Sequence, residues 1–149
     1  MKASQHLPMF EGRALRVCHL GKFYPPAPGG IESHVRALAR AQAARGAEVD
    51  VVCVNHLTEQ GKDLTWRPWL RSVDCEEWDD AVRVTRLGRV GGFKRLELCP
   101  SLSRVLHERT RWADVVKKRH AKRLVMGPGL LDSIARLLRD GGELYVQTD

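Results

Sequence analysis

The chain has 149 residues, 43% of them hydrophobic and 29% charged, which suits one compact globular domain and leaves too little chain for two complete ones. Its 25 Lys and Arg residues against 18 Asp and Glu give a net charge of +7. Either an anionic partner (nucleotide, nucleic acid or acidic membrane surface) or a solvated basic surface is therefore expected. The four cysteines form no Cys-x-x-Cys pair and no apolar run approaches ~20 residues, which argues against a zinc site, a disulfide framework and a membrane span.

The first half of the chain predicts a parallel crossover unit. Residues 1–13 form a tail without the hydrophobic region of a signal peptide, so the cytoplasm is the simplest location. A short apolar strand is predicted over Leu15–Leu20, of the kind buried in a parallel sheet. A helix follows over Ile31–Arg45, because its apolar residues recur at three- and four-residue spacing, and a second apolar strand covers Glu48–Val54. Strand, helix and strand in this order form a right-handed crossover.

The middle of the chain is less regular. Residues 57–80 carry a weak pattern that fits either an irregular loop or a strand pair, and their tryptophans, Trp78 among them, are expected to be packing anchors. Alternating apolar residues predict a third strand over Ala81–Leu87. Residues 88–97 are expected to form a loop.

A sharp change of composition follows. A helix is predicted over residues 100–109, with Ser101 or Ser103 able to cap it, and Ala113–Val116 begins like a fourth strand. The run Lys117–Arg123 then carries five permanent positive charges in seven residues, where a continuing strand should be apolar. As a sequence feature alone, such a run indicates a solvated surface loop.

The chain ends with a further helix and strand. The helix is predicted over Leu130–Leu138 and the strand over Glu143–Gln147, followed by Asp149 at the carboxyl edge, where α/β enzymes bind ligands. Together the elements predict an α/β fold, a Rossmann-like three-layer sandwich with a mostly parallel sheet, either incomplete or chimeric.

The segment Lys22–His34 joins the first predicted strand to the first predicted helix. It contains three prolines followed by Gly29 and Gly30, and two adjacent glycines permit positive φ and close approach of a ligand to the backbone. The positive end of the following helix dipole faces any anion bound there. The alternative is that the glycines only make a tight turn, and Glu32 can simply complement the helix dipole.

Residues 14–116 resemble the N-terminal domain of family-4 glycosyltransferases, which are retaining enzymes of the two-Rossmann GT-B fold. The Pro-Pro loop, the segment Gly29-Gly-Ile-Glu-Ser-His-Val35 and the helix before Val49–Val54 carry the resemblance. It implies transfer of a sugar from a nucleotide-sugar donor to a sugar or lipid acceptor.

The same resemblance implies roles for several loop residues. Gly29 and Gly30 would approach the donor, and Lys22, Glu32 and His34 would be further donor or acceptor contacts, while no catalytic residue is assigned. It implies no metal and no firmly bound cofactor. A second Rossmann domain would hold most of the nucleotide, so this chain alone is expected to bind the donor weakly and to be inactive.

Residues 117–149 resemble instead the C-terminal half of bacterial tRNA (guanine-N7)-methyltransferases, through the basic run and Arg139-Asp-Gly-Gly-Glu-Leu-Tyr-Val-Gln-Thr-Asp149. The resemblance implies that Lys117 and Asp149 bind the substrate guanosine. It implies that further basic residues meet tRNA phosphates or order the loop, namely Arg119, His120, Lys122 and Arg123. The S-adenosylmethionine loop of that family is missing, and Ala113-Asp-Val stands where the family has Asp-Pro-Trp.

The two resemblances change over between Val116 and Lys117 without a linker, which favours one compact unit over two domains. Three hypotheses follow. The first is the acceptor-side half of a glycosyltransferase. The second is an S-adenosylmethionine-dependent tRNA methyltransferase-like fragment that binds tRNA. The third is a non-functional truncated or fused product that self-associates through an open sheet edge. Peripheral membrane contact is compatible with the basic charge. The glycosyltransferase resemblance ranks first because it covers the larger part of the chain, including the nucleus of the sheet.

Overall fold

The computed structural model of the protein describes residues 12–27, 29–56, 71–93, 96–119 and 143–147. The elements follow in the order β1 (Arg16–Leu20), α1 (Gly30–Ala44), β2 (Glu48–Val54), β3 (Cys75–Asp79), β4 (Val82–Leu87), β5 (Gly91–Phe93), β6 (Leu96–Leu98), α2 (Leu102–Trp112), β7 (Val115–Arg119) and β8 (Glu143–Gln147).

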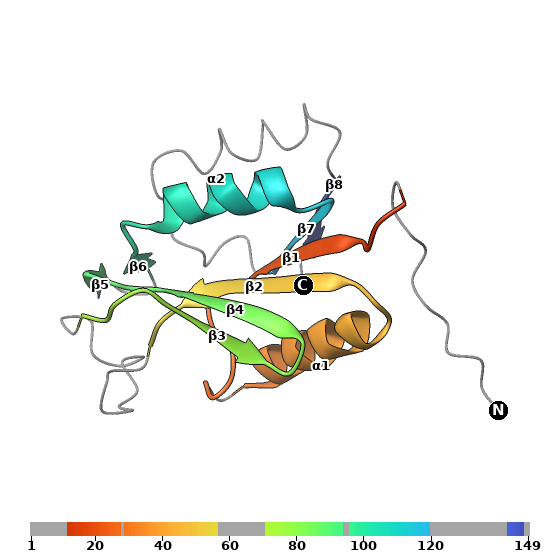
Figure 1. The fold of residues 1–149 in the computed structure, drawn as a ribbon. Helices are drawn as coiled ribbons and strands as arrows, with labels where there is room; N and C mark the ends of the chain where they lie inside the picture. Colours follow the sequence, from red (N-terminus) through yellow and green to blue (C-terminus); the bar gives the residue numbers. More distant parts are fainter. Residues whose placement is uncertain (1–11, 28, 57–70, 94–95, 120–142, 148–149) are drawn as a thin grey trace.

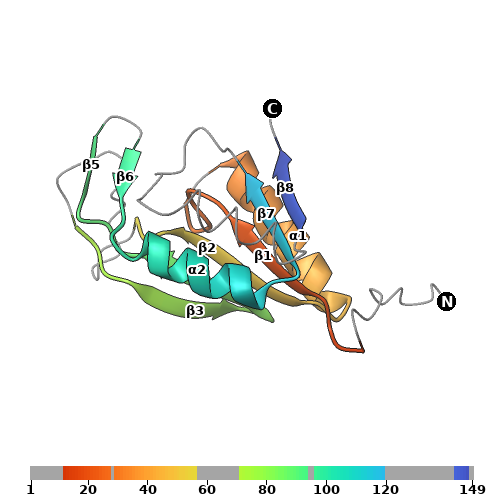
Figure 2. The same ribbon diagram turned by 90° about the horizontal axis from the view of Figure 1, so that it is seen from above.

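Six of these strands form one sheet, in the order β3-β4-β2-β1-β7-β8. All of them run parallel except β3, which is antiparallel to β4. The chain grows from β1 toward β2 and β4 on one side, and β7 and β8 lie on the other side (Figure 2). The direction of growth therefore reverses between β1 and β7, as in Rossmann-like folds. The predicted α/β fold with a mostly parallel sheet is confirmed.

Of the described helices, α2 covers one face of the sheet, above it in Figure 1, and α1 covers the other face, below it. Alternation along β2 sends Val49 and Val51 into the core under α1, where they share a cluster with Ala39. Val52 enters the opposite core with Leu106 of α2. Since β2 is buried toward both faces, it suits a central position in the sheet.

Most strand and helix predictions are confirmed, with ends that differ by one residue or fewer. The strand predicted over Leu15–Leu20 is β1, and the helix predicted over Ile31–Arg45 is α1. The predictions over Glu48–Val54 and Glu143–Gln147 match β2 and β8, and the one over Ala81–Leu87 matches β4. The helix predicted over 130–138 lies outside the described residues.

Four details of the prediction are corrected. Residues 88–97 are not only a loop, because β5 and β6 pair there as a small antiparallel sheet. The Ser101 hydroxyl caps nothing and instead binds the Asp74 carboxylate. The strand begun at Ala113–Val116 continues as β7 into the basic run as far as Arg119, since backbone pairing with β1 and β8 outweighs the polar composition. Trp78 is 71% exposed and is not a packing anchor.

The two outer strands of the sheet are β3 and β8, and self-association through them stays a prediction. No described helix has the length and hydropathy that a membrane crossing requires. Within the described ranges, no cluster of His, Cys, Asp or Glu is suited to hold a metal ion. At the start of the fold, Arg13 donates two hydrogen bonds of 2.7 Å to Asp114, which ties the end of the N-terminal tail to the beginning of β7.

Candidate functional site

The reversal point of the sheet brings together the two segments singled out in the sequence. The loop that starts at Gly21 leaves the carboxyl end of β1, which is paired in parallel with β7. Leu20 is in register with Lys118, so the backbone at the beginning of the basic run lies beside the start of the loop. Open α/β sheets bind ligands in the crevice beyond the carboxyl ends of their strands, at this reversal point.

A buried arginine holds the proline part of the loop. The Arg86 side chain is 2% exposed, and its guanidinium donates to the carbonyl oxygens of Pro25 at 2.5 Å and Tyr24 at 3.5 Å. The same group donates to Glu77 of β3 at 2.8 Å. The backbone N–H of Ala27 donates to the carbonyl oxygen of Tyr24 at 3.2 Å, which closes a tight turn. The loop is therefore fixed from the side of β4.

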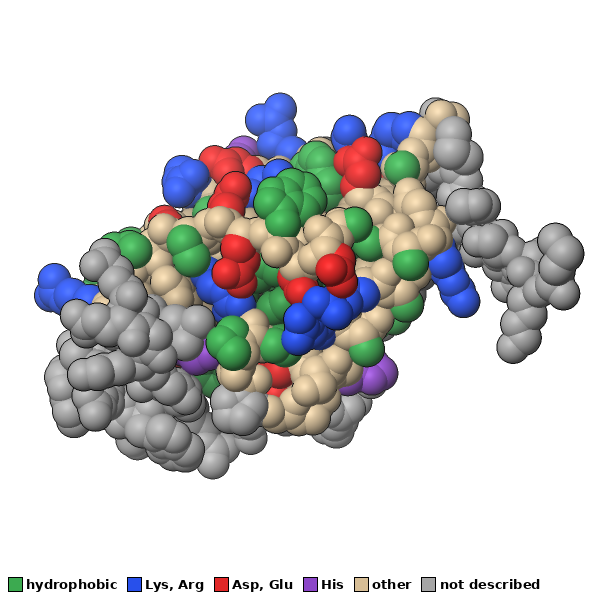
Figure 3. Space-filling model, turned by 60° about the horizontal axis from the view of Figure 1, so that its bottom comes forward, with side chains coloured by type: hydrophobic (Ala, Val, Ile, Leu, Met, Phe, Trp, Pro, Cys, Tyr) green, Lys and Arg blue, Asp and Glu red, His purple; other side chains and the backbone are tan. Residues whose placement is uncertain are grey.

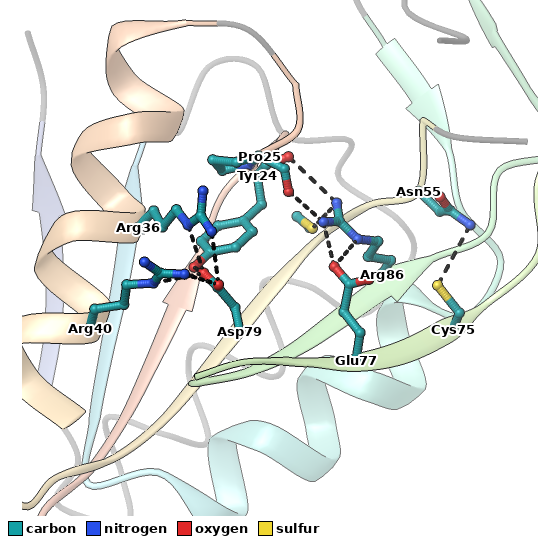
Figure 4. A network of polar contacts seen from close by, with 10 residues as sticks. Tyr24, Pro25, Arg36, Arg40, Asn55, Cys75, Glu77, Asp79 and Arg86 are labelled. Atoms are coloured by element: carbon teal, nitrogen blue, oxygen red, sulfur yellow. Dashed lines mark hydrogen bonds and ion pairs between the residues drawn. The ribbon is translucent and has the colours of Figure 1, made fainter. Parts of the chain in front are cut away.

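Asp79, the last residue of β3, connects the loop to α1 (Figure 4). It accepts a 2.6 Å hydrogen bond from the Tyr24 hydroxyl, whose ring is buried. It also accepts hydrogen bonds of 2.9 and 3.0 Å from Arg36 and is bound by Arg40. Burial alone would raise the pKa of Asp79, but the hydrogen bonds from Arg40, Arg36 and Tyr24 outweigh it and hold the pKa well below its ordinary value.

We expect Asp79→Asn to lower the free energy of unfolding by about 1–3 kcal/mol at neutral pH, since it removes charge-assisted hydrogen bonds. The pKa of Asp79 in the folded chain lies below the unfolded value of 3.8. The stabilisation is therefore present above pH 3.8 and is lost as pH falls from 3.8 through the folded pKa. Urea unfolding across this range should therefore show the wild-type advantage shrinking in acid. Asp80→Asn is the matched control: Asp80 is 71% exposed and has a φ of 55° that asparagine tolerates. An equal effect of both variants would contradict the special role of Asp79.

The two glycines lie at the start of α1, Gly29 as its N-cap and Gly30 as its first residue, but they differ in their surroundings. Gly29 is the N-cap with φ at 153°, a conformation that L-residues rarely adopt, and the carboxylate of Glu32 lies against it. Gly30, by contrast, faces open space, because a Cβ there would meet no described atom within 4 Å. The backbone conformation at position 29 and its contact with Glu32 therefore require glycine there. No described part of the fold requires glycine at position 30.

Lys22 lies in the loop after β1, and His34 lies on α1. The ammonium group of Lys22 is 3.5 Å from Glu97, which is buried and also pairs with Arg89 at 2.6 Å, and it lies 5.0 Å from the centre of the Phe23 ring. Lys22 therefore belongs to an ion cluster at the carboxyl ends of β1 and β4. His34 is exposed on α1.

The residues tied to the methyltransferase resemblance are only partly described. Lys117 and Arg119 belong to β7, next to β1 and β8. The other four lie outside the described residues: His120, Lys122, Arg123 and Asp149.

The fold and the loop define a Rossmann-like α/β domain with a glycine-containing loop at the reversal point of its sheet. Comparison with protein families matches residues 29–140 to the glycosyl transferase 4-like domain. This match covers more than half of the chain, and the protein belongs to that family. No curated protein and no solved structure gives a match to the chain. The matched range begins at Gly29 and extends past residue 117, and no comparison supports the methyltransferase resemblance.

Proposed function

We propose that this chain is the acceptor-side Rossmann half of a retaining GT-B glycosyltransferase, which moves a sugar from a nucleotide-sugar donor to a sugar or lipid acceptor. The family match supports the proposal, and its strongest structural support is the position of Gly30. This residue begins α1 at the reversal point of the sheet and has open space in front of it. A donor diphosphate there would meet backbone N–H groups and the positive end of the helix dipole.

Under this proposal, each loop residue has a different role in binding the substrates. Gly30 allows close approach of the donor, and Gly29 sets the backbone direction that makes the approach available. We propose Glu32 and His34, on the first turns of α1, and Lys22, in the loop just after β1, as contacts of the donor or the acceptor. Most of the donor nucleotide would be held by a second Rossmann domain, so we propose weak donor binding and no turnover by this chain alone.

Titration of the isotope-labelled chain with a nucleotide-sugar, followed by NMR, tests this function. We expect the amide signals of residues 29–32 to shift in a saturable way, and the nucleotide without its sugar to shift fewer of them. S-adenosylmethionine and tRNA serve as parallel titrations. Absence of any effect of the nucleotide-sugar on these signals would refute the proposal, and saturable binding of S-adenosylmethionine would favour the methyltransferase hypothesis in its place.

The two glycines give a paired prediction. Gly30→Ala should retain the fold and raise the free energy of unfolding by up to about 1 kcal/mol, because alanine favours the helix and has room for its methyl group. The same variant should weaken nucleotide-sugar binding, since the methyl group occupies the space of the ligand. Gly29→Ala should instead destabilise the chain by about 1–2 kcal/mol through its positive φ. Thermal denaturation and the NMR titration measure both effects, and unchanged binding by Gly30→Ala would count against the proposed donor position.

A further inference from the structure

A groove lies beside the proposed donor loop, between its proline segment and α1. It has a volume of about 440 Å³ and is lined mainly by Pro25, Pro26 and Ala27 on one side, and by Ser33, Arg36 and Arg40 on the other. This volume lies within the range of small-molecule sites in proteins. Among the described residues, the lining contains two guanidinium groups and no carboxylate, so its chemistry suits an anion.

Asp79 orients both arginines from outside the groove. Arg36 binds Asp79 through Nε and Nη2, and Arg40 does so through the same two nitrogens. The Nη1 atoms take no part in these bonds, and Figure 4 shows the remaining end of each guanidinium turned away from Asp79. A guanidinium fixed on one side in this way loses less conformational entropy when its other side binds a ligand.

The two guanidinium groups line the groove, whereas the carboxylates that pair with them do not. Asp79 supplies one negative charge to two guanidinium groups whose side chains are 41% and 38% exposed. The second nearby carboxylate, Asp80, is 71% exposed, pairs with Arg40 at 3.1 Å and does not line the groove. Figure 3 shows basic and acidic side chains gathered on this face of the molecule.

We propose that this groove binds a phosphoryl group carried by the acceptor, so that the chain acts on a phosphorylated acceptor. Arg36 and Arg40 would receive the phosphate oxygens in charge-assisted hydrogen bonds, and the proline and alanine walls would pack against the uncharged body of the molecule. The phosphoryl group can belong to a soluble sugar phosphate or to a lipid headgroup. The assignment of this ligand as the acceptor rests on the proposed glycosyltransferase function, whereas the binding of a phosphoryl group does not.

A second groove on the opposite side of β3 shows that arginines alone do not make such a site. It has a volume of about 250 Å³, and Arg104 and Arg109 line it together with Asp74, Glu76 and Glu108. Carboxylates outnumber guanidinium groups there, so we expect no phosphate binding. Arg104, which is 64% exposed and pairs with Glu108, therefore provides a control that removes an arginine from a groove where no phosphate binding is expected.

The test uses the full chain at physiological salt, with calorimetric titration of glucose 6-phosphate, glucose and inorganic phosphate. We expect the sugar phosphate to bind and glucose not to bind. Arg36→Gln with Arg40→Gln should weaken the binding of the sugar phosphate by about tenfold or more, the effect of losing at least one charge-assisted hydrogen bond. Arg104→Gln should leave it unchanged. Flotation with phosphatidylcholine vesicles, with and without phosphatidic acid, tests the lipid source with the same variants.

Failure of both the sugar phosphate and the phosphatidic acid vesicles to bind would overturn the proposal, as would equal weakening by the Arg104 variant. Should the double variant unfold, Arg36→Lys decides: it keeps the charge but cannot make the planar contact, so unchanged binding would also overturn the proposal. Titration with a nucleotide-sugar tests the glycosyltransferase function independently of the phosphate site. Phosphate binding that depends on Arg36 and Arg40, without donor binding, would retain the groove as a phosphate site and refute the glycosyltransferase function.

Discussion

Arg86→Met is expected to lower the free energy of unfolding by about 2–3 kcal/mol and to loosen the segment that carries the proposed donor loop. The guanidinium is buried, and its removal leaves the carbonyl oxygens of Pro25 and Tyr24 without their charged donor. Glu77 is half exposed and can be solvated after the change, which keeps the cost below that of an isolated buried charge. Urea denaturation measures the loss of stability.

Hydrogen exchange separates the loss of stability from the effect on the loop. In the wild type, the backbone N–H of Ala27 donates to Tyr24 in the turn that Arg86 holds. Its exchange should accelerate more in Arg86→Met than the exchange of amides in β2. Arg83→Met is the control, because Arg83 lies on the same strand but binds Asp50 on the other face of the sheet. If both variants accelerate the exchange of Ala27 equally, Arg86 does not hold the loop.

The central part of the fold was predictable because burial in a parallel sheet leaves long apolar runs in the sequence. Strands β1, β2 and β4 and helix α1 show this pattern directly. Strand β3 was not predictable from hydropathy, because Cys75–Asp79 carries three acidic residues and is mostly exposed. It is defined by antiparallel pairing with β4 through a tight turn at Asp80, whose φ is 55°. A turn-forming aspartate before an alternating strand was the one available signal.

From the sequence, only the backbone turn of the candidate site was predictable, and the side chains that hold this turn were not. Adjacent glycines after a strand and before a helix predict an anion-facing turn in an α/β fold, and the structure places Gly29 at the N-cap of α1. The side chains that hold this turn come from distant parts of the sequence. Tyr24 binds Asp79, which is 55 positions away, and Arg86 binds the carbonyl oxygen of Tyr24 from 62 positions away. Such pairs are specified by strand order, which local patterns do not contain.

The excess of basic residues leads to one conclusion from composition and to another from the fold. At the level of composition, the excess of arginine indicates an anionic partner. In the fold, Arg83, Arg86 and Arg109 are bound to carboxylates of the chain itself, so they stabilise the packing of β4 and α2 against their neighbours. Arg36 and Arg40 share Asp79 as Arg83 and Arg109 share Asp50, but they line an open groove whose described lining has no carboxylate. Position, and not the number of basic residues, is therefore the basis on which we propose this groove as an anion site.

Arg109→Met should destabilise the chain by about 3–5 kcal/mol, because it leaves the carboxylate of Asp50 without its main partner. Asp50 is fully buried in β2, and Arg109 of α2 binds its carboxylate. The same guanidinium also donates hydrogen bonds to Glu76 at 2.9 Å and to Thr85 at 3.2 Å. Burial raises the pKa of Asp50 despite the attraction of Arg109 and Arg83. The charged form of Asp50 is therefore already disfavoured in the wild type, and loss of Arg109 removes the larger of the two attractions that offset this cost.

The pH dependence gives the sharper test. A folded pKa above the unfolded value of 3.8 means that stability falls as pH rises through the interval between the two values. Arg109→Met moves the folded pKa of Asp50 further upward, so the interval widens and the loss of stability should be greater at about pH 8 than at about pH 5.

Asp50→Asn combined with Arg109→Met should recover part of the loss, because no buried charge remains without its partner. Arg104→Met, an exposed change on the same helix, should cost under about 1 kcal/mol at both pH values. A loss that is independent of pH, and that the double variant does not reduce, would mean that Arg109 stabilises α2 through packing and not through the charge of Asp50.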